Sequence, residues 1–126
     1  MDSKLFILLA SLMGFCSVAL GAFGAHALKQ KLSPEMLNIF EVGARYQMYH
    51  ALALLFVGLS YSILSSQTLF YSGWFFVFGS LIFSGSLYTL ALTGIKTFGA
   101  ITPIGGILLL LGWGCLIFSA IFSKIQ

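Results

Sequence analysis

The chain has 126 residues, of which 60% are hydrophobic and only 7% are charged, and its mean hydropathy is +1.05. In soluble domains roughly a quarter of all residues are charged. This composition therefore excludes an ordinary soluble domain and indicates an integral membrane protein. The net charge of +3 comes from scattered basic residues. Because none of them forms the kind of run that grips nucleic acid, we expect no nucleic-acid partner.

The apolar segments predict one all-α membrane domain, residues 1–126, with four transmembrane helices in an antiparallel bundle. About 20 apolar residues cross a bilayer, and the expected spans cover about residues 5–28, 45–65, 69–92 and 99–123. The first apolar run is longer than the core of a secretory signal peptide, which favours a retained first span. The basic residues of the short connections favour an orientation with both termini outside.

A helix start precedes the second span. Ser33 is a good N-cap, Pro34 suits the first helical position, and Glu35 suits the positive end of the helix dipole. A helix running unbroken from there through the second span would exceed the hydrocarbon thickness. We therefore expect an interfacial amphipathic helix at about residues 34–44, with a possible bend at Gly43.

In an antiparallel bundle, the ends of spans one and three lie at the same membrane face as the starts of spans two and four. Most polar residues of the spans are expected at this face. The opposite half of the bundle is nearly pure apolar sequence, so the expected polar site is one-sided. Ionisable residues inside a membrane are functional candidates by default. The candidate ligand-binding or polar cluster comprises His26, Glu41, Arg45, Gln47, Tyr49, His50, Ser84, Tyr88, Thr102 and Pro103.

Several of these residues have more than one interpretation. Arg45 is either an anchor that reaches headgroups or pairs with Glu41, or a group that holds an anionic ligand or lipid headgroup. His26 and His50 suit interhelical hydrogen bonding, proton relay or, least well, metal ligation. Tyr88 suits a hydrogen bond within the bundle better than acid catalysis.

Pro103, with Gly105 and Gly106 after it, predicts an interruption near the start of the fourth span, either a simple kink or a broken-helix binding site. Cys16 and Cys115 lie in apolar segments without metal-type spacing and are expected to be small buried hydrophobes. No catalytic motif is present. We therefore expect neither an enzyme nor a cofactor, and no metal site.

Four ordered motifs carry a family resemblance: residues 21–28, 45–52, 83–88 and 101–106. Together they make the chain similar to the YgdD/YwdK family of small bacterial inner-membrane proteins, catalogued as domain of unknown function 423, with mitochondrial-type relatives in animals. The resemblance covers essentially the whole chain. It implies four membrane helices and a multi-pass protein of the bacterial cytoplasmic membrane, and it implies no reaction.

Two functions remain open from the sequence. One is a small transporter or channel-like protein, expected to be a homo-oligomer because four spans are few for a pathway, with a small-molecule or ion ligand at the polar site. The other is a structural or accessory membrane protein that binds lipid or a larger membrane complex through faces of small residues.

Overall fold

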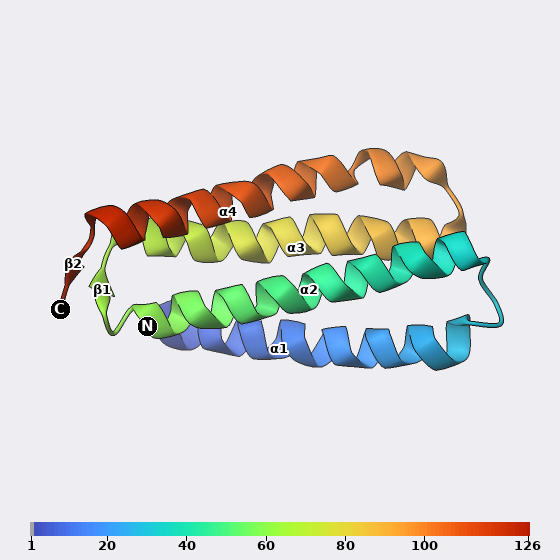
Figure 1. Cartoon of the computed structure of the whole chain (residues 1–126), viewed down its shortest axis with the longest axis horizontal. Coiled ribbons are helices and arrows are strands. Elements are labelled where there is room, and N and C mark those ends of the chain that lie inside the picture. The colour runs from blue at the N-terminus through green and yellow to red at the C-terminus, as the bar shows by residue number, and fades with distance from the viewer. Residues whose placement is uncertain (1) are drawn as a thin grey trace.

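A computed structural model of the chain describes residues 2–126 and contains four long helices (Figure 1). The elements, in chain order, are α1 (Asp2–Phe23), the π-helical turn η1 (Gly24–Leu28), α2 (Pro34–Ser60), β1 (Leu64–Ser65), α3 (Gln67–Thr93), the 3-10 turn η2 (Lys96–Ala100), α4 (Thr102–Phe122) and β2 (Lys124–Ile125). The all-α class predicted from the composition is confirmed.

Local sequence explains where the central helices begin and end. The Ser33 hydroxyl accepts a hydrogen bond from the backbone N–H of Met36 at 3.2 Å, and Pro34 follows it, as the sequence predicts. Ser66 caps α3 in the same way through the N–H of Thr68. The helix α3 ends at Gly94, whose φ of 70° is the left-handed conformation that glycine adopts without strain.

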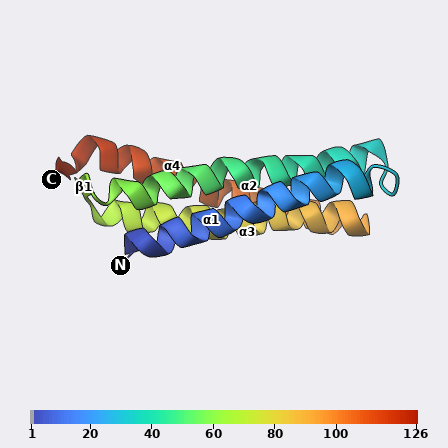
Figure 2. The ribbon, with the colours of Figure 1, turned by 90° about the horizontal axis from the view of Figure 1, so that it is seen from below.

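The helices run antiparallel, and each packs against the next along the chain. Figure 1 shows them side by side in the order α1, α2, α3, α4. Figure 2, turned by 90°, places α1 in front of the central pair α2 and α3, and α4 behind it. The bundle therefore has a rhombic section, with α2 and α3 in the middle and α1 and α4 at opposite corners.

Two groups of buried side chains hold the bundle together. The larger group lies between all four helices and includes Phe6, Leu54, Val57, Phe76 and Leu109. The Phe6 ring occupies the space that the missing side chain of Gly73 leaves, because a Cβ there would lie 2.4 Å from the ring. The smaller group joins the turn η1, the start of α2 and the end of α3 through Leu28, Phe40 and Ala91.

Much of the outer surface is apolar, as a membrane environment requires. Phe15, Leu110 and Phe122 are among the large side chains that are at least two-thirds exposed. Three helical stretches, Asp2–Leu28, Gln67–Thr93 and Lys96–Phe122, are long and apolar enough to cross a membrane. The helix α2 is not among them, since charged and polar residues occupy its first half.

The expected separation of residues 34–44 from the second span is not found, because α2 is one uninterrupted helix of 27 residues. Its first turns pack inside the bundle, where Phe40, Gly43 and Ala44 are buried. At Gly43 the backbone stays helical. A Cβ there would lie 2.9 Å from the ring of Tyr88, so this glycine allows close packing and is not a bend.

The expected fourth span, about residues 99–123, changes from a 3-10 turn to an α-helix directly before Pro103, and the residues after Pro103 are continuously α-helical. The helix α4 begins at Thr102, which puts Pro103 in its first turn, where the missing N–H of proline costs no intrahelical hydrogen bond. The preceding residues form the separate turn η2. After α4 the chain pairs back on the α2–α3 connection, where β2 lies antiparallel to β1 with Leu64 opposite Ile125.

Candidate functional site

Gln47 joins three helices. Its amide Nε2 donates to the carbonyl of Met13 on α1 at 2.8 Å, and its Oε1 accepts a hydrogen bond from the Tyr88 hydroxyl on α3 at 2.7 Å. The phenol reaches Gln47 because a helical tyrosine leans back toward the N-terminus of its own helix. Both polar ends of the Gln47 amide are therefore occupied by neighbouring helices.

This polar contact lies at the middle of α2. Gln47 stands thirteen residues from either end of α2, whereas its partner Tyr88 stands five residues before the end of α3. The sequence predicted that Gln47 and Tyr88 belong to one cluster, and they do make contact. They meet at the middle of α2, however, which is deeper in the bundle than the end where the cluster was expected.

His50 makes a second contact, toward α4. Its Nδ1 lies 2.8 Å from the carbonyl of Tyr46, one turn earlier, and its Nε2 lies 3.1 Å from the indole Nε1 of Trp113. Nδ1 therefore donates and Nε2 accepts, which is the uncharged form of the imidazole. The ring is buried and also packs against Phe76. Nε2 thus joins α2 to α4, whereas Nδ1 bonds within α2 and fixes the orientation of the ring.

Serine hydroxyls bind backbone carbonyls of neighbouring helices along the whole bundle. A helix carbonyl has a second lone pair for such a donor. The four bonds, between 2.6 and 2.8 Å, run from Ser3 to Gly58, Ser17 to Ala44, Ser72 to Gly112, and Ser84 to Gly43. Three of the four acceptors are glycines, where the absent side chain lets the helices approach closely.

These bonds correct the expectation of a one-sided polar site. Ser3 and Ser72 make their contacts in the half of the bundle that was expected to be almost purely apolar. In the same half, Ser119 of α4 hydrogen bonds with Ser66 and Thr68 at the start of α3. Polar contacts are therefore distributed along the helices, because hydroxyls join every consecutive pair.

Other members of the predicted cluster are not brought together. His26, Arg45, Tyr49 and Pro103 are exposed. Within residues 2–126, neither Arg45 nor the half-buried Glu41 takes part in an ion pair or a side-chain hydrogen bond. Thr102 bonds to the Ser86 hydroxyl at 2.6 Å, away from Gln47. In the described residues no group of three potential metal ligands comes together.

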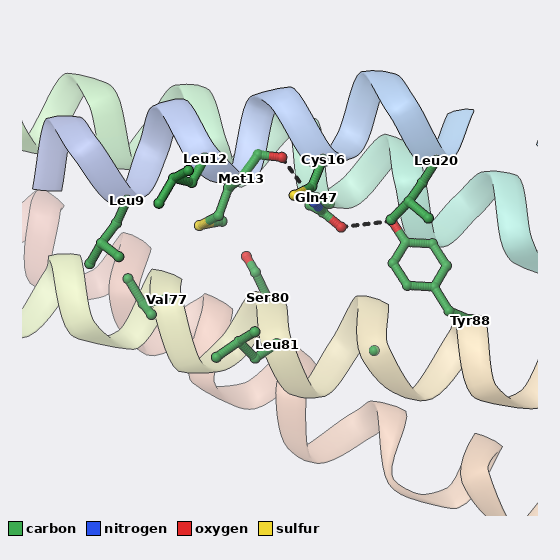
Figure 3. A pocket seen from close by; sticks show the side chains of 11 residues that line it. Leu9, Leu12, Met13, Cys16, Leu20, Gln47, Val77, Ser80, Leu81 and Tyr88 are labelled. Atoms are coloured by element: carbon green, nitrogen blue, oxygen red, sulfur yellow. Dashed lines mark hydrogen bonds between the residues drawn. The ribbon is translucent and has the colours of Figure 1, made fainter. Parts of the chain in front are cut away.

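A cavity of about 360 Å³ lies beside the Gln47 contact, between α1 and α3 (Figure 3). Its volume falls in the usual range for small-molecule sites, about 300–1,000 Å³. Its walls are mostly apolar, and Gln47 and Tyr88 lie at one end. The lining residues are Leu9, Leu12, Met13, Cys16, Leu20, Gln47, Val77, Ser80, Leu81, Gly85 and Tyr88.

Ser80 lines this cavity and differs from the other buried serines of the described chain. Its side chain extends into the space between α1 and α3 (Figure 3), its residue surface is 4% exposed, and its buried Oγ has no hydrogen-bond partner among residues 2–126. Cys16, expected to be buried, is instead exposed and lines the same cavity. Both cysteines are free.

The sequence predicted part of this arrangement. Gln47, His50, Ser84 and Tyr88 stood out as polar residues in apolar helices. Trp113 was missed as the partner of His50, since nothing in the apolar sequence of α4 tells which side faces α2. The carbonyls of Met13, Gly43 and Gly112 were also missed, because every residue has a carbonyl and only packing selects the ones that accept.

Comparisons with known proteins agree with a membrane protein. Residues 20–106 match the model of a family described as protein of unknown function (DUF423). A UPF0382 membrane protein of Staphylococcus epidermidis is 48% identical over 118 residues, which cover 94% of this chain and 96% of that protein. The UPF0382 membrane protein of Staphylococcus saprophyticus is 50% identical over 110 residues, covering 87% and 91%.

The UPF0382 membrane protein YwdK of Bacillus subtilis is 40% identical over 119 residues, covering 94% of this chain and 97% of YwdK. No solved structure matches the chain. The family match and the nearly full-length relatives confirm the resemblance found in the sequence motifs, and with the three apolar helical stretches they indicate a membrane protein. The chain belongs to the DUF423 family.

Proposed function

We propose that this chain is an accessory membrane protein that binds an apolar molecule of the bilayer at the side of its bundle. The observation that carries the proposal is the cavity between α1 and α3, whose lining is almost entirely apolar. Leu12 and Leu81, which flank it, are more than half exposed on the outer surface. A molecule dissolved in lipid would therefore reach the cavity without crossing water.

The proposal includes four membrane-spanning helices, a multi-pass arrangement in the bacterial cytoplasmic membrane. For α2 to span, its Glu41 and Arg45 must lie near one surface while Gln47 and His50 lie inside. Helix packing supports this, because α2 is in the centre of the bundle and its mid-length polar groups are paired with α1, α3 and α4. Paired polar groups cost far less in lipid than unpaired ones.

Transport, the other function expected from the sequence, has less support. His50 already uses both ring nitrogens, which leaves it without a free site for a relayed proton or an ion. Arg45 is exposed and makes no side-chain hydrogen bond within residues 2–126. The expectation of a homo-oligomer depended on a transport pathway, so it has less support if the chain forms no pathway.

Binding is tested with benzophenone, a neutral aromatic ketone that attaches to nearby C–H bonds on irradiation. The full chain is reconstituted in lipid nanodiscs, irradiated with the probe, and mapped by peptide mass spectrometry. We expect adducts to concentrate on Met13, Cys16 and Leu81, which line the cavity. Adducts spread evenly over exposed side chains such as Phe15 and Leu110 would refute the proposal.

Transport is tested separately in liposomes containing the purified chain. We expect no movement of protons or of small cations above that of empty liposomes under an imposed gradient. A flux that Arg45→Ala or His50→Ala abolishes would favour the transporter instead. The orientation, with both termini outside, is tested by labelling single cysteines introduced at Lys4 and Lys31 from one side of intact cells.

A further inference from the structure

We infer that the cavity selects molecules that carry a hydrogen-bond acceptor within the hydrocarbon core, and that the Ser80 hydroxyl is the donor that recognises it. The inference rests on the proposed function, since it names the ligand class of the same cavity. Its ligand is a neutral, largely hydrocarbon molecule with a carbonyl oxygen, of which ketones and prenylated quinones are examples.

The first step is the unused hydroxyl. A buried hydroxyl without a partner is destabilising, and most such groups in proteins are paired. The other buried serines in the interior of α3, Ser72, Ser84 and Ser86, all donate to a backbone carbonyl. Ser80 alone among the buried serines of the described chain has no partner, and it is the one that lines the cavity.

The second step is the hydroxyl's capacity to reach a ligand. A helical serine can direct its hydroxyl to the carbonyl one turn earlier, as Ser60 does toward Phe56, but Ser80 does not. Its Oγ has almost no accessible surface. Its side chain already extends into the space between α1 and α3 (Figure 3), where a ligand carbonyl supplies the missing acceptor.

The third step is the depth of the site. Ser80 stands thirteen residues from either end of α3, which is roughly 20 Å of helix on each side. Phospholipid headgroups and their ester carbonyls lie at the interfaces, outside a core of about 30 Å. An acceptor at the depth of Ser80 therefore belongs to a molecule that dissolves in the core, and not to a phospholipid headgroup.

The fourth step is the absence of charge around the site. None of the residues that line the cavity carries a charge, and an unpaired ion would be costly at this depth. The Gln47 amide and the Tyr88 hydroxyl, which also line the cavity, already bond to each other. Ser80 therefore carries the one lining hydroxyl that has no hydrogen bond in the described chain, and the ligand that it recognises is neutral.

The test compares two competitors of the same shape in the benzophenone experiment: dicyclohexyl ketone, which has a carbonyl, and dicyclohexylmethane, which has none. We expect the ketone to suppress the cavity adducts at a bilayer concentration about fivefold lower than the concentration of dicyclohexylmethane that has the same effect. This ratio is expected for one hydrogen bond of typical net strength. Ser80→Ala should bring this ratio to about one. Ser84→Ala, one turn further along α3, should leave it unchanged.

Ser80→Cys provides a second variant of nearly the same size with a weaker donor, and its ratio should fall between those of the wild type and Ser80→Ala. Equal potency of the two competitors on the wild-type chain would overturn the inference, and so would a fivefold ratio that persists in both Ser80 variants. In those outcomes the cavity still binds apolar molecules. If neither competitor reduces the adducts, the proposed function fails as well.

Discussion

The Tyr88 hydroxyl donates to the side chain of Gln47, a residue 41 positions earlier in the chain, at 2.7 Å. The same Gln47 amide donates to the backbone of Met13. One side chain of the central helix α2 therefore fastens the two helices that border the cavity. The contact lies between the two places where buried side chains join the first helical stretch to α3, which are near Phe6 and near Leu28.

Gln47→Leu should lower the free energy of unfolding by about 1–2 kcal/mol. Interhelical hydrogen bonds in membrane proteins average about 0.6 kcal/mol with a maximum of about 1.7, and this substitution removes two of them. The measurement is unfolding in mixed micelles with increasing denaturing detergent, followed by circular dichroism. Gln67→Leu, at an exposed position in the first turn of α3, is the control and should change little.

Tyr88→Phe should lower the free energy of unfolding by less than Gln47→Leu does, since the Gln47 amide keeps its bond to Met13. In the double variant the Tyr88 substitution should add almost nothing, because its partner is already absent. Fully additive costs would show that the two side chains act independently and would contradict the contact.

Gly105→Ala should destabilise the packing of α3 against α4 by about 1–3 kcal/mol, the usual cost of overpacking. A Cβ at Gly105 would lie 2.4 Å from the backbone nitrogen of Phe83, and a backbone atom cannot move aside alone. Gly114→Ala in the same helix is the matched control, because a Cβ there meets nothing within 4 Å.

The control variant should be neutral or slightly stabilising, since alanine has the higher helix propensity. The same detergent titration measures both variants. If Gly105→Ala were as stable as Gly114→Ala, the close approach of the two helices at Phe83 would be wrong.

Ser80→Ala should leave the stability of the ligand-free chain unchanged or raise it by up to about 1 kcal/mol. The substitution removes a buried hydroxyl that has no hydrogen bond, and an unsatisfied buried group is destabilising. Ser84→Ala removes a bond to the carbonyl of Gly43 and should lower stability by about 0.6 kcal/mol. A loss for Ser80→Ala as large as that for Ser84→Ala would mean that the Ser80 hydroxyl has a partner.

The Trp113 indole N–H should exchange with deuterium at least tenfold more slowly than that of Trp74. Trp113 donates to His50, and its bond must open before exchange, whereas Trp74 has no side-chain hydrogen bond in the described residues. Solution NMR in micelles resolves the two indole signals. His50→Ala should remove most of the difference, and an unchanged difference would contradict the pairing.

Much of the fold followed from the sequence because lipid-exposed helices need long apolar stretches and helix ends need recognisable caps. Ser33 and Pro34 marked the start of α2 correctly. Gly43 was expected to permit a bend and instead permits close packing, and Pro103 lies in the first turn of α4. Glycine and proline interrupt helices in some contexts, but glycine also permits close packing and proline also begins helices, and only the neighbouring elements decide between these roles.

The sequence indicated which polar residues make contacts, but it did not indicate which residues pair with one another. Gln47 and Tyr88 were conspicuous in apolar helices, yet the small-residue faces did not reveal that α2 and α3 occupy the centre while α1 and α4 stand at opposite corners. The cavity depends on that arrangement. It forms where α1 lies beside α3 without packing tightly against it, a property of helix placement that no single segment encodes.

The sideways opening of the cavity determines how any affinity must be expressed. A molecule that enters from lipid first partitions into the bilayer, so occupancy depends on its mole fraction there and not on its concentration in the buffer. Adding empty vesicles at a fixed total amount of ligand would then empty the site by dilution alone. Two ligands with the same contacts but different solubility in lipid would show very different apparent constants in water.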